Sequence, residues 1–241
     1  MYTFAGVAEV KLYWIGPVTM HRVARDGIAS VVPNYLKLTS NDIVILCFGE
    51  IDCRWHIRKQ GKKNDTSSIE EVDILTARYA KAVAEFQRQT RATVALSCVT
   101  PFVRPNVRCD LYKSRDECLT DTKNIRERMN RNLAVLGYPF VDFFHEVSAP
   151  DGAFLPDFSD GYCHLDSRRS EPVRKALEGL FLARFTHRDP PWPHPRALVE
   201  KAPVSKTRRL RKAIQHLLKS LVLKLPWIRA FRKIHKSAPP K

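Results

Sequence analysis

Two short stretches of almost unbroken hydrophobic residues constrain the fold of this 241-residue chain more than any other feature. They read DIVILCF at 42–48 and ATVALSC at 92–98, and neither alternates between apolar and polar residues. A strand with one solvated face alternates, whereas a strand covered on both faces reads as a continuous apolar run. We therefore predict two buried strands of a parallel sheet. Two further apolar segments, residues 10–15 and 138–144, are candidates for additional strands.

Longer segments with helical periodicity separate these runs. Residues 69–90, 116–136 and 167–185 each place apolar side chains three or four positions apart, as the buried face of a helix requires. Alternating strands and helices are typical of doubly wound α/β proteins. We predict one such domain over residues 1–187.

The remainder of the chain has a different composition. Residues 189–203 contain five prolines, which disfavour helix and central strand, so we predict a proline-rich linker over residues 188–204. Residues 205–241 place leucines at helical spacing among lysines and arginines and predict a basic amphipathic helical tail. Residues 201–241 contain no acidic residue and hold 13 of the chain's 41 lysines and arginines. Of the net charge of +16, only +3 therefore belongs to residues 1–200. The basic charge is therefore no reason to regard the α/β domain as a nucleic-acid binder.

Three roles are open for this tail. Its basic residues, with Trp227 and Phe231, suit an anionic membrane surface. Nucleic acid is a less favoured partner, and a solvated disordered tail is the third alternative. No apolar run approaches the roughly 20 residues of a transmembrane helix, and the N-terminus lacks the features of a secretory signal. We expect a cytoplasmic protein that could reach the membrane periphery through its tail.

The six cysteines contain no C-x-x-C pair, and the expected compartment is reducing. Cys53 and His56 have C-x-x-H spacing, but no second pair matches them. We predict no disulfide framework, no metal site and no cofactor.

Polar residues gather directly after the run at 42–48. Gly49 is followed by Glu50, Asp52, Arg54 and His56. Ligands of open parallel sheets bind at the carboxyl ends of strands, and carboxylates are costly to desolvate there unless they pair or act on a ligand. This segment is a candidate binding loop, and the alternative is an acid–arginine ion pair that only pins the loop.

A second cluster precedes the last predicted helix. Asp160 and His164 lie in the sequence SDGYCHLD at 159–166. An acid can hold an imidazole in one tautomer and stabilise its charged form, which a general base needs. The same pair in a polar loop is more often a surface feature, so its position opposite Gly49 is what makes it a candidate site.

The order of these segments resembles the SGNH (GDSL-like) hydrolases over about residues 1–186. The quoted segments are FGEIDCR at 48–54, Arg78-Tyr79, Asn132-Leu133 before FVD at 140–142, and Asp160-Gly161 with His164-Leu165. The resemblance implies a three-layer, flavodoxin-like α/β fold and an esterase or acyl hydrolase acting on lipids, acylated sugars or thioesters. It also implies that Asp160 and His164 are the catalytic acid and base, and that Gly49 is the glycine of the third family block. Gly16, in WIGPVT, looks like the glycine of the oxyanion hole, although a turn before Pro17 would equally require it.

Three departures from the family pattern matter. Ile51 stands where the family has an asparagine, so that oxyanion donor is missing unless Arg54 replaces it. Three residues, rather than two, separate Asp160 from His164, which puts their pairing in doubt. The Gly-Asp-Ser block with the nucleophilic serine has no match. Neither Ser97 in an apolar run, nor Ser159 beside the acid, nor Cys163 is a good substitute.

These departures lead to a specific expectation. We predict an N-terminally truncated domain that lacks its first strand, is inactive as written and has low stability, and in which residues 1–6 belong to the helix after the missing nucleophile. The substrate would be a small acylated molecule, for example a carbohydrate ester. The alternatives are a non-catalytic relative that binds a sugar or acyl ligand, or an interaction protein that works through its basic tail.

Overall fold

The computed structural model describes residues 3–33, 36–161, 163–187 and 199–201. Three parallel strands form its main sheet in the order β2-β3-β4, with β2 at Ile43–Leu46, β3 at Thr93–Ser97 and β4 at Phe140–Val141. Ile43 is in register with Thr93, and Leu96 with Phe140. Both nearly continuous apolar runs are therefore parallel strands, as predicted. The strand β3 is buried after Thr93, whereas only Leu46 of β2 is buried, so the predicted burial holds for β3 and is wrong for most of β2.

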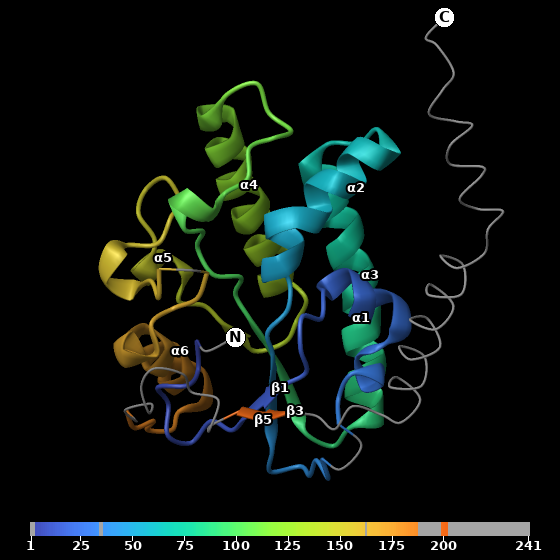
Figure 1. Cartoon of the computed structure of the whole chain (residues 1–241). Coiled ribbons are helices and arrows are strands. Elements are labelled where there is room, and N and C mark those ends of the chain that lie inside the picture. Colours follow the sequence, from blue (N-terminus) through green and yellow to red (C-terminus); the bar gives the residue numbers. More distant parts are fainter. Residues whose placement is uncertain (1–2, 34–35, 162, 188–198, 202–241) are drawn as a thin grey trace, which may run out of the picture. The chain divides into compact units, whose positions relative to one another are not determined.

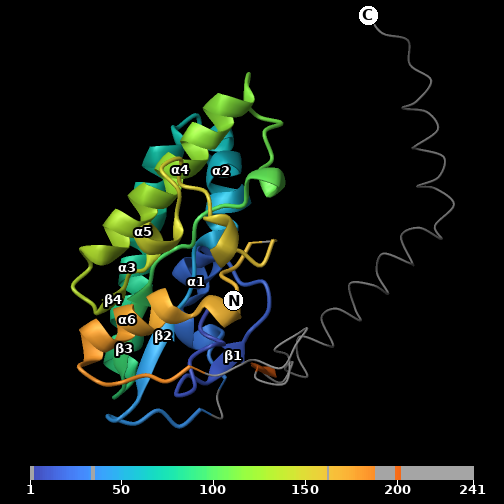
Figure 2. The ribbon, with the colours of Figure 1, turned by 90° about the vertical axis from the view of Figure 1, so that its left-hand side faces the viewer.

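Helices cover both faces of this sheet (Figures 1 and 2). One face packs against α1 (Met20–Asp26), α3 (Ser68–Gln89) and α4 (Arg115–Ala134), in a core that includes Leu46 and Leu96. The other face packs against α6 (Glu171–Phe181), in a core that includes Val141 and Phe143. Two shorter helices, α2 (Ile57–Asn64) and α5 (Phe144–Val147), complete the set in the described residues. The α/β class and the helices predicted at 69–90 and 116–136 are confirmed.

The helix predicted over residues 167–185 is shorter than expected. A 3₁₀ turn at Ser167–Arg169 comes first, and α6 begins at Glu171, one residue before Pro172. Proline fits the first helical turn because its missing N–H is not needed there. The helix ends where Leu182 adopts a left-handed conformation with φ of 50°.

The segment at 10–15 does not join the main sheet. Its strand β1 (Leu12–Trp14) pairs in parallel with β5 (Val199–Lys201). The strand β5 lies within the predicted linker, in a two-stranded sheet and therefore at a sheet edge, where the expectation against helix and central strand does not apply. Residues 188–198 and the whole predicted tail at 205–241 lie outside the described residues. No described helix is both long and apolar enough to span a bilayer.

The strand β2 has an unpaired side in the described part of the chain. The carbonyl oxygen of Asp42 accepts a hydrogen bond from the Thr93 N–H at 2.9 Å, so Asp42 faces β3. Backbone groups of successive residues point to opposite sides of a strand, and those of Ile43, Ile45 and Cys47 therefore point away from β3. The Ile43 side chain is 44% exposed. We call this side, made of Ile43, Ile45 and Cys47, the open edge.

Two further expectations are corrected. Residues 3–6 form turns rather than a helix, and Phe4 and Val7 are buried beside α6 in the second core. Cys109 and Cys118 form a disulfide, although none was expected. The disulfide joins the loop before α4 to the first turn of that helix, over a sequence separation of nine residues.

Candidate active site

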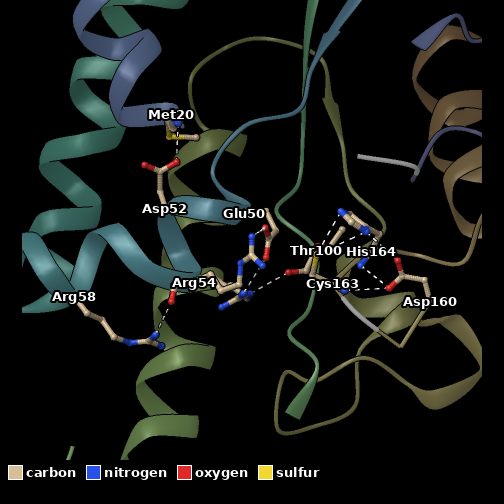
Figure 3. Close-up of polar contacts among 10 residues, drawn as sticks. Met20, Glu50, Asp52, Arg54, Arg58, Thr100, Asp160, Cys163 and His164 are labelled. Carbon is tan, nitrogen blue, oxygen red and sulfur yellow. Dashed lines mark hydrogen bonds and ion pairs between the residues drawn. The ribbon is translucent and has the colours of Figure 1, made fainter. Parts of the chain in front are cut away.

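Asp160 and His164 form a close pair in the turn before α6. His164 Nδ1 lies 2.9 Å from Asp160 Oδ2, and the backbone N–H groups of Cys163 and His164 both donate to Asp160 Oδ1 at 3.0 Å. Gly161, with φ of 78°, makes the tight turn that the extra residue between the acid and the histidine requires. The spacing that cast doubt on this pair is therefore compatible with a direct hydrogen bond (Figure 3).

This hydrogen bond determines the tautomer of the imidazole. When Nδ1 carries the proton and donates it to Asp160, Nε2 holds the lone pair that can accept a proton. Asp160 can also stabilise the imidazolium that would follow, because the two charges would be 2.9 Å apart. The pair thus has the geometry of a general base with its orienting acid.

Cys163 contacts the same imidazole without the geometry of a nucleophile. Its Sγ lies 3.3 Å from His164 Nε2 but also only 3.7 Å from Nδ1. A sulfur in the ring plane at the Nε2 lone pair would be much farther from Nδ1, so this sulfur lies over the face of the ring. Burial also raises the pKa of the Cys163 thiol to about 11, which keeps it protonated at neutral pH.

The residues after β2 form a helix rather than the expected loop. Glu50 and Ile51 are helical, and a π-helical turn at Asp52–His56 continues into α2. Within this run, Arg54 Nη2 contacts Glu50 Oε2 at 3.2 Å, one helical turn away. Glu50 Oε1 lies 3.8 Å from Nη2 of the buried Arg126 on α4.

A narrow surface hollow separates this helix from the Asp160–His164 turn. It is open to solvent, and Cys163 lies in its wall opposite Glu50 and Arg54 (Figure 3). The other lining residues are Arg58, Pro101, Phe102, Val103, Asn106, Val107, Thr122 and Arg126. We call it the arginine hollow. Through Cys163 it adjoins His164, so the two sequence clusters meet at one edge of the sheet.

Other predicted site residues lie elsewhere. Asp52 is fully buried, and its carboxylate accepts hydrogen bonds from the Met20 N–H at 2.6 Å and the His21 N–H at 3.2 Å at the start of α1. Burial raises the pKa of Asp52 to about 6. His56 does not line the hollow, and both burial and the Lys59 charge lower its pKa.

The two predicted glycines differ in their surroundings. Gly49 has φ of 105°, and a Cβ there would lie 2.9 Å from a Val99 methyl carbon. Gly16 has φ of 86°, a Cβ there would meet nothing within 4 Å, and its carbonyl oxygen accepts a hydrogen bond from the Val18 N–H at 2.8 Å. This geometry fits the turn before Pro17 that was the alternative role of Gly16. The role of its N–H in an oxyanion hole stays a prediction.

Arg126 and Arg58 are the functional candidates that the sequence reading missed. Arg126 lies on the buried stripe of α4, four positions after Thr122 and three before Met129. A charged residue within an apolar helical stripe is a signal available from the sequence, because a buried cation requires compensation. Among the described residues, no group of three or more His, Cys, Asp or Glu side chains could hold a metal ion.

Comparison with known proteins returns only distant structural similarity. No protein-family model matches the chain, and no curated protein matches it. A solved structure from Streptococcus pneumonia, named as a platelet activating factor, superposes with a TM-score of 0.38 at 14% identity, and the match covers 57% of this chain and 58% of that one. Phospholipase A1 from Streptomyces albidoflavus superposes with a TM-score of 0.40 at 16% identity, over 68% of this chain and 76% of that one.

Proposed function

We propose that this protein is an ester hydrolase of the SGNH type, with His164 as its general base and Asp160 as the acid that orients it. The observation that carries the proposal is the 2.9 Å contact between His164 Nδ1 and Asp160 Oδ2 beside a hollow at the sheet edge. The proposed substrate is a small acylated molecule, such as a carbohydrate ester.

The nucleophile is the second part of the proposal. No Gly-Asp-Ser sequence occurs in the 241 residues, and Cys163 lacks the required geometry. We propose that a strand from outside these residues pairs with the open edge of β2 and carries the nucleophilic hydroxyl at its carboxyl end. The exposed Ile43 and the backbone groups that point away from β3 support this placement.

The reaction follows from these positions. The hydroxyl oxygen would attack the ester carbonyl carbon while its proton passes to His164 Nε2, and the imidazolium would return that proton to the departing alkoxide. Water would then hydrolyse the acyl-enzyme by the same steps. Arg54 is the proposed donor to the oxyanion, in place of the asparagine that Ile51 replaces.

The test compares two forms of the protein with a small aryl acetate as substrate. One form is the 241-residue chain, and the other is extended by the in-frame codons upstream of Met1. We expect hydrolysis by the extended form only, and a fall of about 10²–10⁴-fold in kcat for its His164→Ala variant. Asp160→Asn should also lower kcat, while the exposed control Lys81→Gln on α3 should not change it.

Each alternative has its own outcome. If the 241-residue chain hydrolyses esters and this activity depends on His164, the external nucleophile is refuted, but the proposal of an ester hydrolase stands. A folded extended form that binds acyl or sugar ligands without hydrolysing esters would refute the hydrolase and favour the binding relative. A stop codon close upstream of Met1 would also contradict the proposal that the external strand belongs to the same polypeptide.

A further inference from the structure

Three arginines surround the arginine hollow, and their positive charge is only partly compensated. Arg54, Arg58 and Arg126 line it, and Glu50 is the single carboxylate among its lining residues. Outside the lining, Asp121 pairs with Arg58 at 3.2 Å. The described groups around the hollow therefore hold more positive than negative charge.

Arg126 is the most deeply buried of the three. Its side chain is 2% exposed, and its Cζ lies 5.7 Å from the centroid of the Phe102 ring, which also lines the hollow. Nε donates to the Thr100 carbonyl oxygen at 3.1 Å, and Nη1 donates to the Thr122 carbonyl oxygen at 3.5 Å. Nη2 makes no hydrogen bond to the described residues, and the Glu50 oxygen 3.8 Å away is beyond hydrogen-bond distance.

A deeply buried guanidinium gains from an added anion. Its burial costs desolvation free energy, and a charge-assisted hydrogen bond to an anion would recover part of that cost. Arg58 is held in place by its hydrogen bonds to Asp121 and the Arg54 carbonyl oxygen, so it requires no rearrangement to contribute its charge. Guanidinium groups match the planar oxygens of carboxylates and phosphates.

We propose that the arginine hollow binds an anionic oxygen group, a carboxylate or a phosphate, of the ester substrate. As a statement about the substrate, the inference rests on the proposed function. Cys163 lies between the hollow and the imidazole, with its Sγ 3.3 Å from His164 Nε2. The anionic group would therefore bind one side chain away from the general base, and the substrate would carry its charge close to the ester bond.

The hollow is too small for a complete carboxylate or phosphate, so a side chain must move before the anion can bind. As it stands, the hollow has room for a group about the size of one water molecule. A complete carboxylate or phosphate requires the Arg54 side chain, which is 35% exposed, to turn away from Glu50. The incoming anion thus competes with the Glu50 carboxylate for Arg54 and Arg126.

This competition gives two variants with opposite expected effects. Binding of acetate and of inorganic phosphate to the intact 241-residue chain is measured by isothermal titration calorimetry at fixed ionic strength. Arg54→Gln should weaken binding about tenfold or more, because it removes a charge-assisted hydrogen bond. Glu50→Gln should strengthen it, because the competing carboxylate is gone. Arg88→Gln removes an exposed arginine that pairs with Glu85 on α3, and it is the matched control.

The outcomes separate the ligand sources and the two proposals. Tighter binding of acetate than of phosphate supports a substrate carboxylate, and the reverse supports a phosphate ester. Absence of binding by the wild-type chain, or equal binding by the Arg54→Gln and Arg88→Gln chains, overturns the inference. Because calorimetry needs no turnover, a failed inference leaves ester hydrolysis by the extended form to be judged separately, and a failed hydrolysis assay leaves anion binding intact.

Discussion

Asp52 is a buried carboxylate whose hydrogen bonds link two helices, and it makes stability depend on pH. Its folded pKa of about 6 lies above the ordinary value of 3.8. The folded state therefore binds the proton more strongly than the unfolded state, so the contribution of Asp52 is complete below pH 3.8 and is lost as the pH rises through 6. Between these limits we expect the free energy of unfolding to fall by about 2–3 kcal/mol.

Urea unfolding of the wild type and Asp52→Asn from about pH 4 to about pH 7 measures this effect. At the acidic end of this range the protonated carboxyl and the amide are both neutral, and each offers one carbonyl oxygen to the N–H groups of Met20 and His21. The amide does not titrate, so the variant should lack the fall in stability that the wild type shows as the pH rises. Parallel pH profiles for the two proteins would contradict the assignment.

Gly49 is constrained by both its backbone and its neighbours. Gly49→Ala places a methyl group in a backbone conformation with φ of 105°, 2.9 Å from Val99 and 3.0 Å from Met20. We expect a loss of about 2–4 kcal/mol in the free energy of unfolding, measured by urea titration. Gly137→Ala is the control, since Gly137 has φ of 79° but nothing within 4 Å, and its cost should be about 1 kcal/mol. Equal losses would show that packing against Gly49 does not matter.

At the scale of elements, the disulfide between Cys109 and Cys118 holds a wall of the arginine hollow. Asn106 and Val107 line that wall and lie just before Cys109. Replacing both cysteines by serine should lower the free energy of unfolding by about 2–4 kcal/mol. Thermal unfolding with and without a reductant is the measurement, and a wild-type midpoint that does not respond to reduction would disprove a stabilising disulfide.

The sequence predicts those helices and strands whose hydrophobic pattern depends only on residues within the same element. The runs at 42–48 and 92–98 and the helical periodicities at 69–90 and 116–136 each reflect neighbours within the same element, and each predicted strand or helix is confirmed. The pairing of β1 with β5 depends on segments far apart in the sequence. The Cys109–Cys118 disulfide spans only nine positions, but it depends on how the loop before α4 folds back on that helix. Neither was predicted.

Some features of the candidate site could likewise be predicted from the sequence, and others depend on the packing of distant segments. The two clusters could be found from the residues that follow a buried strand and from the acid beside a histidine. Arg126 lies 76 positions after Glu50, and only the packing of α4 brings the two together. The helical conformation of Glu50 and the tight turn at Gly161 also depend on backbone geometry that residue types alone do not determine.

At the scale of the whole molecule, the tail at 205–241 stays a proposal from the sequence. We propose that its basic residues bind anionic membrane surfaces, where each contributes on the order of 1 kcal/mol. Co-sedimentation with phosphatidylserine vesicles at low salt should show binding by the full chain and none by a chain ending at residue 204. Vesicle binding by the shortened chain would refute this role, and a preference for RNA over vesicles would favour the nucleic-acid alternative.

The open edge of β2 has a consequence for how the 241-residue chain behaves in solution. No described strand pairs with this edge, and Ile43 is exposed, so the edge can add a strand from a neighbour, including a second copy of the chain. The oligomeric state should therefore depend on protein concentration, and Ile43→Lys should favour the monomer in sedimentation velocity runs. Self-association of the 241-residue chain would then compete with the external strand that we propose for this edge.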